Sequence, residues 1–341
     1  MFESEIESIL EFLQEKKDIL ITTHNMVDLD ALSSCFAFKS FLAHHFPNKT
    51  VEILFFDLSK HVKEFMNKFL NLFTSFDFSY QIHAHIDIKA FDALILLDTN
   101  DISFTLSKQE QEAIKESSIP LIIIDHHYSE QALSERTPVA IISDETASTA
   151  ELIFEFFEKV KYRLNTELRY LLLSGILTDT GHFKYADNHS IKRVSKLLSD
   201  LPKDAFQEIL ELIKSEKDIS ERIALIKGLQ RAELHRCKDW LIAISHVSSY
   251  EGAVASKLVK NGFDISIVYS TGKDEDRIST RANKYVIEKT SLHLGKIASE
   301  YGKELGADGG GHDGAAGLNG TFDPKNASKD LLNKIIEILN D

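Results

Sequence analysis

The chain has 341 residues, a hydrophobic share of 43%, a charged share of 27% and a formal net charge of −14 at pH 7. This length allows two domains, and no apolar run approaches the roughly 20 residues that span a membrane. The negative charge disfavours long duplex DNA as a partner but not a short phosphorylated ligand. Two cysteines in no paired motif and an acidic N-terminus lead us to expect a cytoplasmic protein with no membrane partner.

Strands and helices alternate in the first part of the chain. Apolar runs predict strands over residues 18–23, 50–56, 91–97 and 121–124, and apolar spacing predicts helices over 4–16, 31–46, 60–73, 107–117, 149–161 and 165–177. The apolar runs are typical of strands buried on both faces. The alternation therefore predicts an α/β domain over residues 1–187, with a largely parallel sheet and helices on both faces.

A charged helical region over residues 188–215, broken at Pro202, is expected to be a connector. Beyond it we expect a smaller α/β domain over residues 216–341. Its predicted elements are strands at 240–246, 264–270 and 277–283 and helices at 251–260 and 291–303. The turn Thr271-Gly272-Lys273-Asp274-Glu275-Asp276 predicts a hairpin between the last two strands. A glycine-rich run over 309–317 is the last conspicuous feature.

Acidic and imidazole side chains follow three of the predicted strands. His24, Asp28 and Asp30 follow the strand at 18–23, Asp98 follows the strand at 91–97, and Asp125, His126 and His127 follow the strand at 121–124. Asp179 lies at the end of the helix predicted over 165–177. Ligands of parallel sheets bind beyond the carboxyl ends of the strands, so these side chains mark a candidate site.

The combination of carboxylates and imidazoles without thiolate favours Mn²⁺ or a similar divalent metal over structural zinc. Two such ions roughly 3.5–4 Å apart clamp a phosphoryl group and activate water for attack on phosphorus. Each residue also has a structural interpretation, because Asp28 and Asp30 suit a helix cap and Asp98 suits a turn. Their joint occurrence at successive strand ends favours the metal site.

These residues resemble the motifs of the DHH phosphoesterase superfamily. The matching positions are His24-x-x-x-Asp28-x-Asp30, then Asp98, then Asp125-His126-His127, then Asp179. The run Gly309-Gly310-Gly311-His312, followed by Ala315-Ala316-Gly317, is similar to the signature of the DHHA1 domain. Size and layout are most similar to the compact oligoribonucleases of the NrnA kind. Val27 stands where the first motif usually has Pro, and Ser33 where it usually has Gly; neither is a metal ligand in the resemblance.

The resemblance implies a role for each matching residue. Asp98 would bridge two Mn²⁺ ions, with Mg²⁺ or Co²⁺ as alternative metals. One ion would be completed by His24 and Asp28, and the other by Asp30, His126 and Asp179. His127 would contact the scissile phosphate, and Asp125 would orient the motif. In the second domain, the substrate-binding residues would be Arg281, Gly310, Gly311 and His312.

The resemblance also implies an activity: hydrolysis of very short oligonucleotides, such as pApA, to nucleoside monophosphates, with substrate bound across a cleft between the domains. Removal of the 3′-phosphate from adenosine 3′,5′-bisphosphate, cleavage of a cyclic dinucleotide and non-catalytic nucleotide binding stay open as alternatives. The net negative charge disfavours a RecJ-like single-strand DNA exonuclease. The run Gly309-Gly310-Gly311-His312 disfavours an inorganic pyrophosphatase. The oligomeric state is open, with a homodimer as one alternative.

Overall fold

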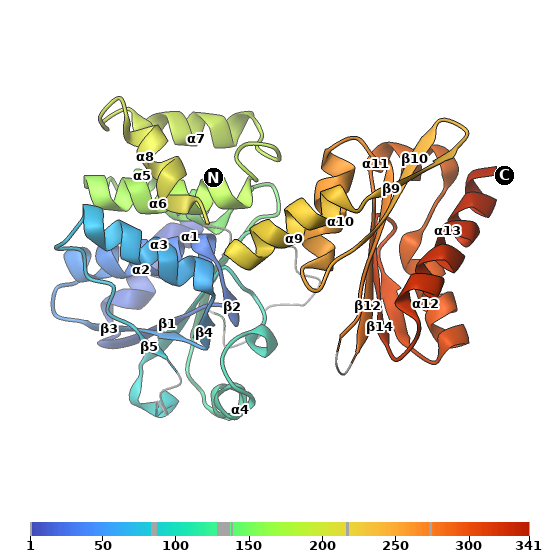
Figure 1. The fold of residues 1–341 in the computed structure, drawn as a ribbon. Helices are drawn as coiled ribbons and strands as arrows, with labels where there is room; N and C mark the ends of the chain where they lie inside the picture. Colours follow the sequence, from blue (N-terminus) through green and yellow to red (C-terminus); the bar gives the residue numbers. More distant parts are fainter. Residues whose placement is uncertain are drawn as a thin grey trace. The chain divides into compact units, whose positions relative to one another are not determined.

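The computed structural model describes residues 2–82, 87–127, 137, 139–215, 218–272 and 275–340. The chain divides into two compact units, residues 1–215 and 216–341 (Figure 1). Residues 188–215, expected to be a connector, belong to the first unit, because buried side chains of their two helices join its hydrophobic core. Arg193 in this region also pairs with the buried carboxylate of Glu151 at 2.6 Å.

The first unit is built on a six-stranded sheet in which every neighbouring pair is parallel, which confirms the predicted sheet. The strand order is β5-β3-β1-β6-β7-β8. The strands are β1 (Asp18–Thr22), β3 (Thr50–Phe55), β5 (Gln81–Ile82), β6 (Ala93–Leu97), β7 (Leu121–Asp125) and β8 (Val139–Ile142). Two further short strands, β2 (Met26–Val27) and β4 (Asp57–Leu58), pair with each other in parallel.

The helices of the first unit cover both faces of this sheet (Figure 1). They are α1 (Glu3–Gln14), α2 (Leu29–His45), α3 (Lys60–Leu72), α4 (Lys108–Glu116), α5 (Thr149–Lys159), α6 (Thr166–Asp179), α7 (Asn188–Leu198) and α8 (Ala205–Ile213), with the 3₁₀ turns η1 (Ile88–Ala90) and η2 (Ile102–Phe104). Side chains alternate between the two faces along each strand. On β6, Ile95 and Leu97 join the core beneath α2, α5 and α6, whereas Leu94 and Leu96 pack with Ile114 of α4. This two-sided burial explains the uninterrupted apolar runs of the sequence.

The second unit has a six-stranded mixed sheet in the order β13-β14-β12-β11-β10-β9. Only β10 and β11 run parallel; the other pairs are antiparallel. Its strands are β9 (Glu233–Cys237), β10 (Trp240–His246), β11 (Ile265–Ser270), β12 (Asp276–Ala282), β13 (Asp308–Gly311) and β14 (Ala315–Gly320). The predicted hairpin of β11 and β12 is present, although Lys273 and Asp274 of its turn lie outside the described residues.

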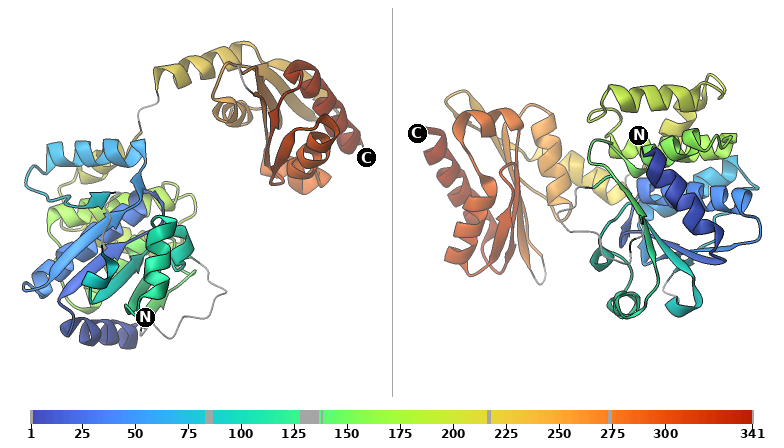
Figure 2. Two further views of the ribbon diagram at one scale, coloured as in Figure 1. Left: turned by 90° about the horizontal axis from the view of Figure 1, so that it is seen from below. Right: turned by 180° about the vertical axis from the view of Figure 1, so that it is seen from behind.

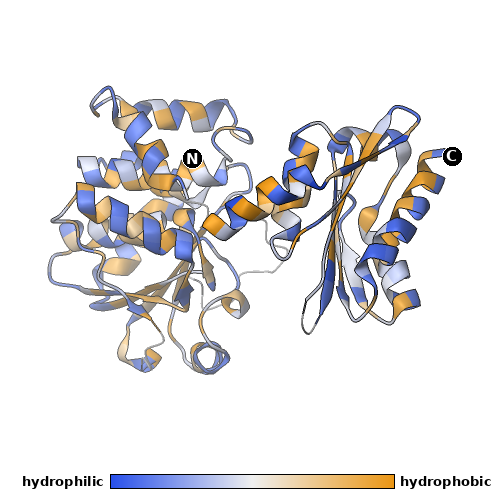
Figure 3. Ribbon diagram, viewed as in Figure 1, coloured by the Kyte–Doolittle hydropathy of each residue, from blue (hydrophilic) through white to orange (hydrophobic). Residues whose placement is uncertain are grey.

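Helices also cover both faces of the second sheet, as Figure 2 shows from two sides. α12 (Leu294–Leu305) and α13 (Pro324–Asn340) pack on one face, and α9 (Ile219–Gln230) and α10 (Glu251–Lys260) pack on the other; α11 (Lys284–Thr290) follows β12. Hydrophobic and hydrophilic residues alternate along the helices of both units (Figure 3). Within the described residues, none of the helices combines the length and the apolar character that crossing a membrane requires.

The glycine-rich run forms a strand, β13, which lies directly against α12. A Cβ atom at Gly309 would be 2.1 Å from the carbonyl oxygen of Ala298 and 2.6 Å from the side chain of Leu318. A Cβ atom at Gly310 would meet nothing within 4 Å. Gly309 is therefore required by the close packing of helix on strand, whereas Gly310 presents an open backbone.

We predict that Gly309→Ala destabilises the second unit by about 1–3 kcal/mol, because the added methyl group overpacks the contact between α12 and β13. Gly310→Ala is the matched control and should change the free energy of unfolding by less than about 0.5 kcal/mol. Trp240, the sole tryptophan, lies on β10, so its fluorescence during urea unfolding reports on this unit. Equal effects of the two substitutions would contradict this account of the glycine run.

Candidate metal centre

The strand order of the first sheet brings the predicted metal-binding side chains together. β1, β6 and β7 are consecutive neighbours, so their carboxyl ends meet at one edge of the sheet. His24 follows β1, Asp98 follows β6 directly, and Asp125 ends β7. α6 ends at Asp179, which lies close to His126. Side chains far apart in the sequence thus form one cluster.

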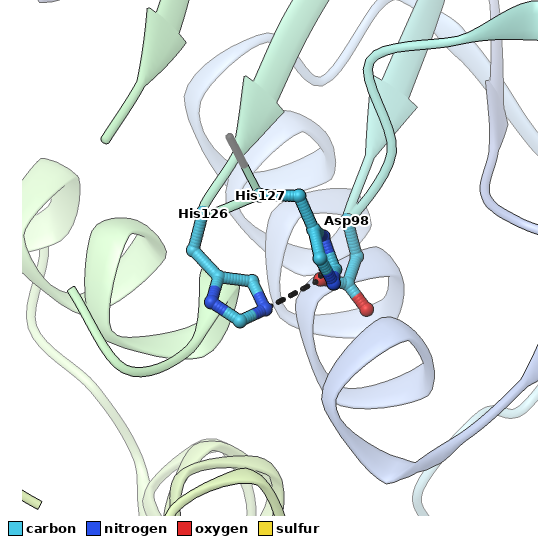
Figure 4. A group of neighbouring side chains, drawn as sticks. All are labelled: Asp98, His126 and His127. Atoms are coloured by element: carbon cyan, nitrogen blue, oxygen red, sulfur yellow. Dashed lines mark ion pairs between the residues drawn. The ribbon is translucent and has the colours of Figure 1, made fainter. Parts of the chain in front are cut away.

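Three overlapping groups of side chains have ligand atoms within 4.8 Å of one another among the described residues. The groups are His24, Asp28 and Asp98; Asp30, His126 and Asp179; and Asp98, His126 and His127. Figure 4 shows the third group, in which the ring of His126 is directed towards the carboxylate of Asp98. The first two groups match the two ligand sets that the sequence resemblance implies, and Asp98 lies within reach of both.

Asp98 is the centre of the cluster. Its side chain is buried, with Oδ2 3.3 Å from Nε2 of His24 and Oδ1 3.5 Å from Nε2 of His126. Its backbone has a φ of 59°, a conformation that non-glycine residues adopt rarely and that is found at functional sites. The hydroxyl of Thr149 donates a hydrogen bond of 2.8 Å to Oδ1 and holds the carboxylate in place.

Asp30 is buried against the N-terminus of α5. Its two oxygens accept hydrogen bonds from the backbone N–H groups of Thr149 (2.6 Å) and Ala150 (2.9 Å). A helix N-terminus carries partial positive charge and stabilises a carboxylate there. No motif in the sequence assigns a role to Thr149. The start of a helix was visible at this position, but its proximity to Asp30 depends on the tertiary structure.

Asp28 serves both as a helix cap and as a member of the cluster. Its Oδ1 accepts a hydrogen bond of 3.0 Å from the N–H of Ala31 at the start of α2. Its Oδ2 lies 3.8 Å from Nε2 of His24. The two interpretations of this residue in the sequence are therefore compatible, because each uses a different oxygen.

His127 is oriented by a buried carboxylate. Nδ1 of its ring lies 2.8 Å from Oδ1 of Asp125, which leaves Nε2 without a hydrogen bond to any described residue. The amide of Asn100 donates to Oδ2 of Asp125 at 2.6 Å and to the carbonyl of His127 at 3.1 Å. No motif marks Asn100 as a functional residue either, and its only signal in the sequence is its position two residues after Asp98.

The crowding of negative charge changes the acidity of the site. Limited hydration and the charge of Asp98 raise the pKa of Asp28 to about 6, and the same causes raise the pKa of Asp30 well above its usual value. Burial opposes the protonation of His24 and His126, but neighbouring carboxylates outweigh burial and raise the pKa of both rings. The hydrogen bond to Asp125 raises the pKa of His127.

The residues present fit a divalent cation. Nε2 of His126 is buried and makes no hydrogen bond to any residue that the structure describes, although oxygens of Asp179 and Asp98 lie 3.3 and 3.5 Å away. An unpaired buried nitrogen between two carboxylates is costly for the protein alone, and a bound cation would satisfy it. Hard carboxylate oxygens with imidazole nitrogens suit Mn²⁺ and similar metals.

A cavity of about 530 Å³ opens beside the cluster. Five of the predicted residues line it: His24, Asp28, Asp98, Asp125 and His127. The remaining lining residues are Asn25, Met26, Thr99, Asn100, Asp101 and Phe104. No Lys or Arg is found among these lining residues, so a bound phosphate would depend on cations for charge neutralisation.

The four predicted substrate-binding residues all lie in the second unit. Arg281 is on β12, where its guanidinium donates to Oγ of Ser279 (3.2 Å) and to the carbonyl of Thr280 (2.8 Å). Gly310 and Gly311 are on β13, and His312 follows in the turn to β14 with an exposed side chain. The backbone of this turn is fixed, because the N–H of Gly295 donates to the carbonyl of His312 at 2.8 Å.

We predict that the affinity for Mn²⁺ falls as the pH is lowered from 7.5 to 5.5. A raised carboxyl pKa means that Asp28 keeps its proton up to about pH 6, and a cation must displace this proton. Below about pH 6 the dissociation constant should rise by up to roughly tenfold per pH unit for each proton displaced. Calorimetric titration of the metal-free protein with Mn²⁺ at several pH values measures this dissociation constant.

Asp204→Asn is a suitable control for this titration, because Asp204 is exposed and makes no capping hydrogen bond with its side chain. The control should bind Mn²⁺ like the wild type at every pH. Asp28→Asn should bind more weakly at pH 7.5. An affinity that does not change between pH 7.5 and 5.5 would contradict the assigned cluster.

Comparison with known families identifies both parts of the chain. The profile of the DHH family, N-terminal domain, matches residues 18–176, and the profile of the DHHA1 domain matches residues 247–341. An uncharacterized protein of Methanocaldococcus jannaschii is 31% identical over 97% of this chain and 95% of its own length. These matches cover the metal cluster and the glycine-rich run.

Relatives with named activities match smaller parts. A probable manganese-dependent inorganic pyrophosphatase of Thermotoga maritima is 31% identical over 40% of this chain and 24% of its own length. The cyclic-di-AMP phosphodiesterase PdeA of Listeria monocytogenes is 22% identical over 66% of this chain and 34% of its own length.

Among solved structures, an exopolyphosphatase-related protein from Bacteroides fragilis has the same fold, with a TM-score of 0.67 and 18% identity over 99% of this chain and 98% of its own. The matched profiles, the full-length relative and the cluster of carboxylates and imidazoles agree with one another. The chain belongs to the DHH family, carries a DHHA1 domain, and is a metal-dependent phosphoesterase.

Proposed function

We propose that this protein is a Mn²⁺-dependent phosphodiesterase that hydrolyses very short oligonucleotides, such as pApA, to nucleoside monophosphates. The observation that carries the proposal is a pair of neighbouring ligand groups, one of which contains Asp98 while the other has His126 3.5 Å from Asp98, next to an oriented and accessible His127. His24 and Asp28 would hold one ion, Asp30, His126 and Asp179 would hold a second, and Asp98 would contact both. Bound divalent cations neutralise phosphate charge and activate water for attack on phosphorus.

In this proposal His127 acts on the phosphate. Its raised pKa favours the protonated ring, and Asp125 holds Nδ1, so the proton on Nε2 points away from the protein framework. That N–H can donate to an oxygen of the scissile phosphate and supply a proton as the leaving oxygen departs. Asp125 acts through His127, by fixing the ring orientation, and Asn100 in turn fixes Asp125.

The second unit supports a nucleotide as the substrate. Arg281 is half-buried and makes hydrogen bonds only to a hydroxyl and a carbonyl, with no carboxylate partner among the described residues. An unpaired, partly desolvated guanidinium is suited to bidentate binding of a terminal phosphate. Gly310 has an open backbone and His312 an exposed ring, and both are available to a ligand. A small inorganic substrate would not require this additional surface.

One alternative substrate has a specific observation in its favour. The relative from Listeria monocytogenes that is named a cyclic-di-AMP phosphodiesterase matches 66% of this chain. Cleavage of a cyclic dinucleotide would use the same metal cluster and the same Arg281. Comparison of linear pApA, cyclic di-AMP, adenosine 3′,5′-bisphosphate and pyrophosphate, each with Mn²⁺, separates these activities by their products.

We predict that Asp98→Asn removes hydrolysis of pApA to the level of a blank, because it weakens both ligand groups at once. Asp125→Asn should reduce kcat roughly 10–100-fold, as expected for a residue that positions another. The activity of both variants is measured as the rate of AMP release from pApA in reactions that contain Mn²⁺, with chromatography to separate the products. Asp204→Asn should hydrolyse pApA at the wild-type rate.

Two results would contradict the proposal. One is full activity of Asp98→Asn. The other is a wild-type enzyme that releases phosphate from pyrophosphate but no monophosphate from any dinucleotide. Binding of nucleotides without product from any compound would instead support the non-catalytic alternative.

We predict that Arg281→Ala raises the KM for pApA by roughly 10–100-fold with a smaller change in kcat, because a charge-assisted hydrogen bond to phosphate is lost. Arg281→Lys should recover only part of this loss, since an ammonium group cannot make the bidentate contact. Arg277→Ala is the matched control: Arg277 is on the same strand, is exposed and pairs with Glu275 at 3.6 Å. Equal changes in KM for Arg277→Ala and Arg281→Ala would contradict the assignment.

A further inference from the structure

Two apolar side chains stand exposed at the mouth of the metal cavity. Phe104 and Met26 both line the cavity, with exposed fractions of 64% and 81%. The protein has 22 phenylalanines, all within the described residues, and Phe104 is the only one that is exposed. Scattered apolar residues are common on protein surfaces, but two that share a cavity with metal-binding side chains suggest a ligand contact.

The backbone that carries Phe104 is held rigidly beside His24. The carbonyl of Phe104 accepts a hydrogen bond of 2.7 Å from the N–H of Asn25, and His24 forms a β-bridge with Thr105. The side-chain amide of Gln111 donates to the carbonyls of Ser103, Thr105 and Leu106 at 3.2, 2.7 and 3.1 Å. The backbone that carries the exposed ring is thus held in place before any ligand arrives, which lowers the entropic cost of a contact.

Met26 is also fixed by its backbone. It lies on β2, where it pairs with Asp57 of β4, and the neighbouring Val27 is buried in the core. The alternation of a strand therefore directs Met26 outwards while Val27 anchors the segment. A thioether is a flexible and polarisable group that packs well against an aromatic ring.

The chemistry of the cavity indicates what these side chains contact. Its ionisable lining is made of carboxylates and imidazoles, and an inorganic phosphate chain would find no favourable contact with an exposed phenyl ring or thioether. A nucleotide, in contrast, has a flat apolar ring close to its phosphate. We propose that Phe104 and Met26 bind the nucleobase of the nucleotide whose phosphate lies at the metal cluster. This inference rests on the proposed function and specifies nucleotides, not inorganic phosphates, as substrates of the cavity.

Stacking on a phenyl ring depends on the π-face that every base offers, so this contact favours nucleotides without strong selection among bases. The contact is a positioning interaction, since neither side chain reaches the reacting atoms through a polar group. Its loss should therefore affect KM more than kcat.

The test compares substrates with and without bases, using the full-length protein with Mn²⁺. Phe104→Ala should raise the KM for pApA roughly tenfold or more, and should leave the KM for the same dinucleotide lacking both bases unchanged. Phe104→Trp should keep the wild-type KM, and Met26→Ala should show a smaller rise than Phe104→Ala. Ile191→Ala, at an exposed apolar position on α7, is the control and should not change either KM.

A second measurement separates this inference from the proposed function. Calorimetry with AMP and with ribose 5-phosphate gives the contribution of the base to affinity without any turnover. The wild type should bind AMP roughly tenfold more tightly, and Phe104→Ala should bind the two ligands almost equally.

Four outcomes are distinct. Loss of the preference for AMP in Phe104→Ala supports the inference even if no dinucleotide is hydrolysed, in which case the proposed function alone fails. An unchanged preference in Phe104→Ala overturns the inference even if pApA is cleaved rapidly. A wild-type protein that binds AMP and ribose 5-phosphate equally also overturns it. A rise in KM that is equal for the substrates with and without bases has the same consequence, because the contact would then not involve the base.

Discussion

The close approach of several carboxylates at one edge of a parallel sheet is the constraint on which the rest of this structure depends. Burial of these carboxylates and the repulsion between their like charges together raise the pKa of Asp28 and Asp30. The protein offsets part of this repulsion with its own groups: the N-terminus of α5 at Asp30 and the hydroxyl of Thr149 at Asp98. Nε2 of His126 lies between the carboxylates of Asp98 and Asp179 and makes no hydrogen bond to a described residue. The site is therefore complete only with a cation, and the family to which the chain belongs uses that cation for chemistry on phosphate.

The sheet topology brings the side chains of the metal cluster together. β1, β6 and β7 lie side by side, so the residues that follow each strand converge although they are separated by many positions in the sequence. α6 then delivers Asp179 at its C-terminal end. The same topology buries both faces of the strands, which makes the base of the site rigid. A rigid base with a strained residue at its centre, Asp98, suits a site that must hold ligands in one geometry.

The two units have different chemistry. The first unit offers carboxylates, imidazoles and two exposed apolar side chains, and none of the described residues that line its cavity is a Lys or Arg. The second unit offers an arginine without a carboxylate partner and an open glycine backbone beside an exposed histidine.

The sequence by itself determined the class of site, because apolar runs that end in His and Asp predict buried strands with ligands at their carboxyl ends. It also predicted most helices and strands, and the resemblance of its motifs implied two ligand sets whose residues the structure brings close together. It did not indicate that residues 188–215 join the first unit, since burial of their apolar side chains depends on α6 and α5. The glycine run did not indicate that Gly309 is required for packing against α12, a role that only the structure shows, whereas the backbone of Gly310 is open.

Thr149, Asn100 and Phe104 could not be recognised from periodicity or motif. Each acts through a contact with a residue far away in the sequence or through its position at the cavity. Local propensity and spacing determine which side chains leave the end of a strand. Which other side chains meet them depends on the order in which strands pair and on the path of each helix, and only the tertiary structure decides that.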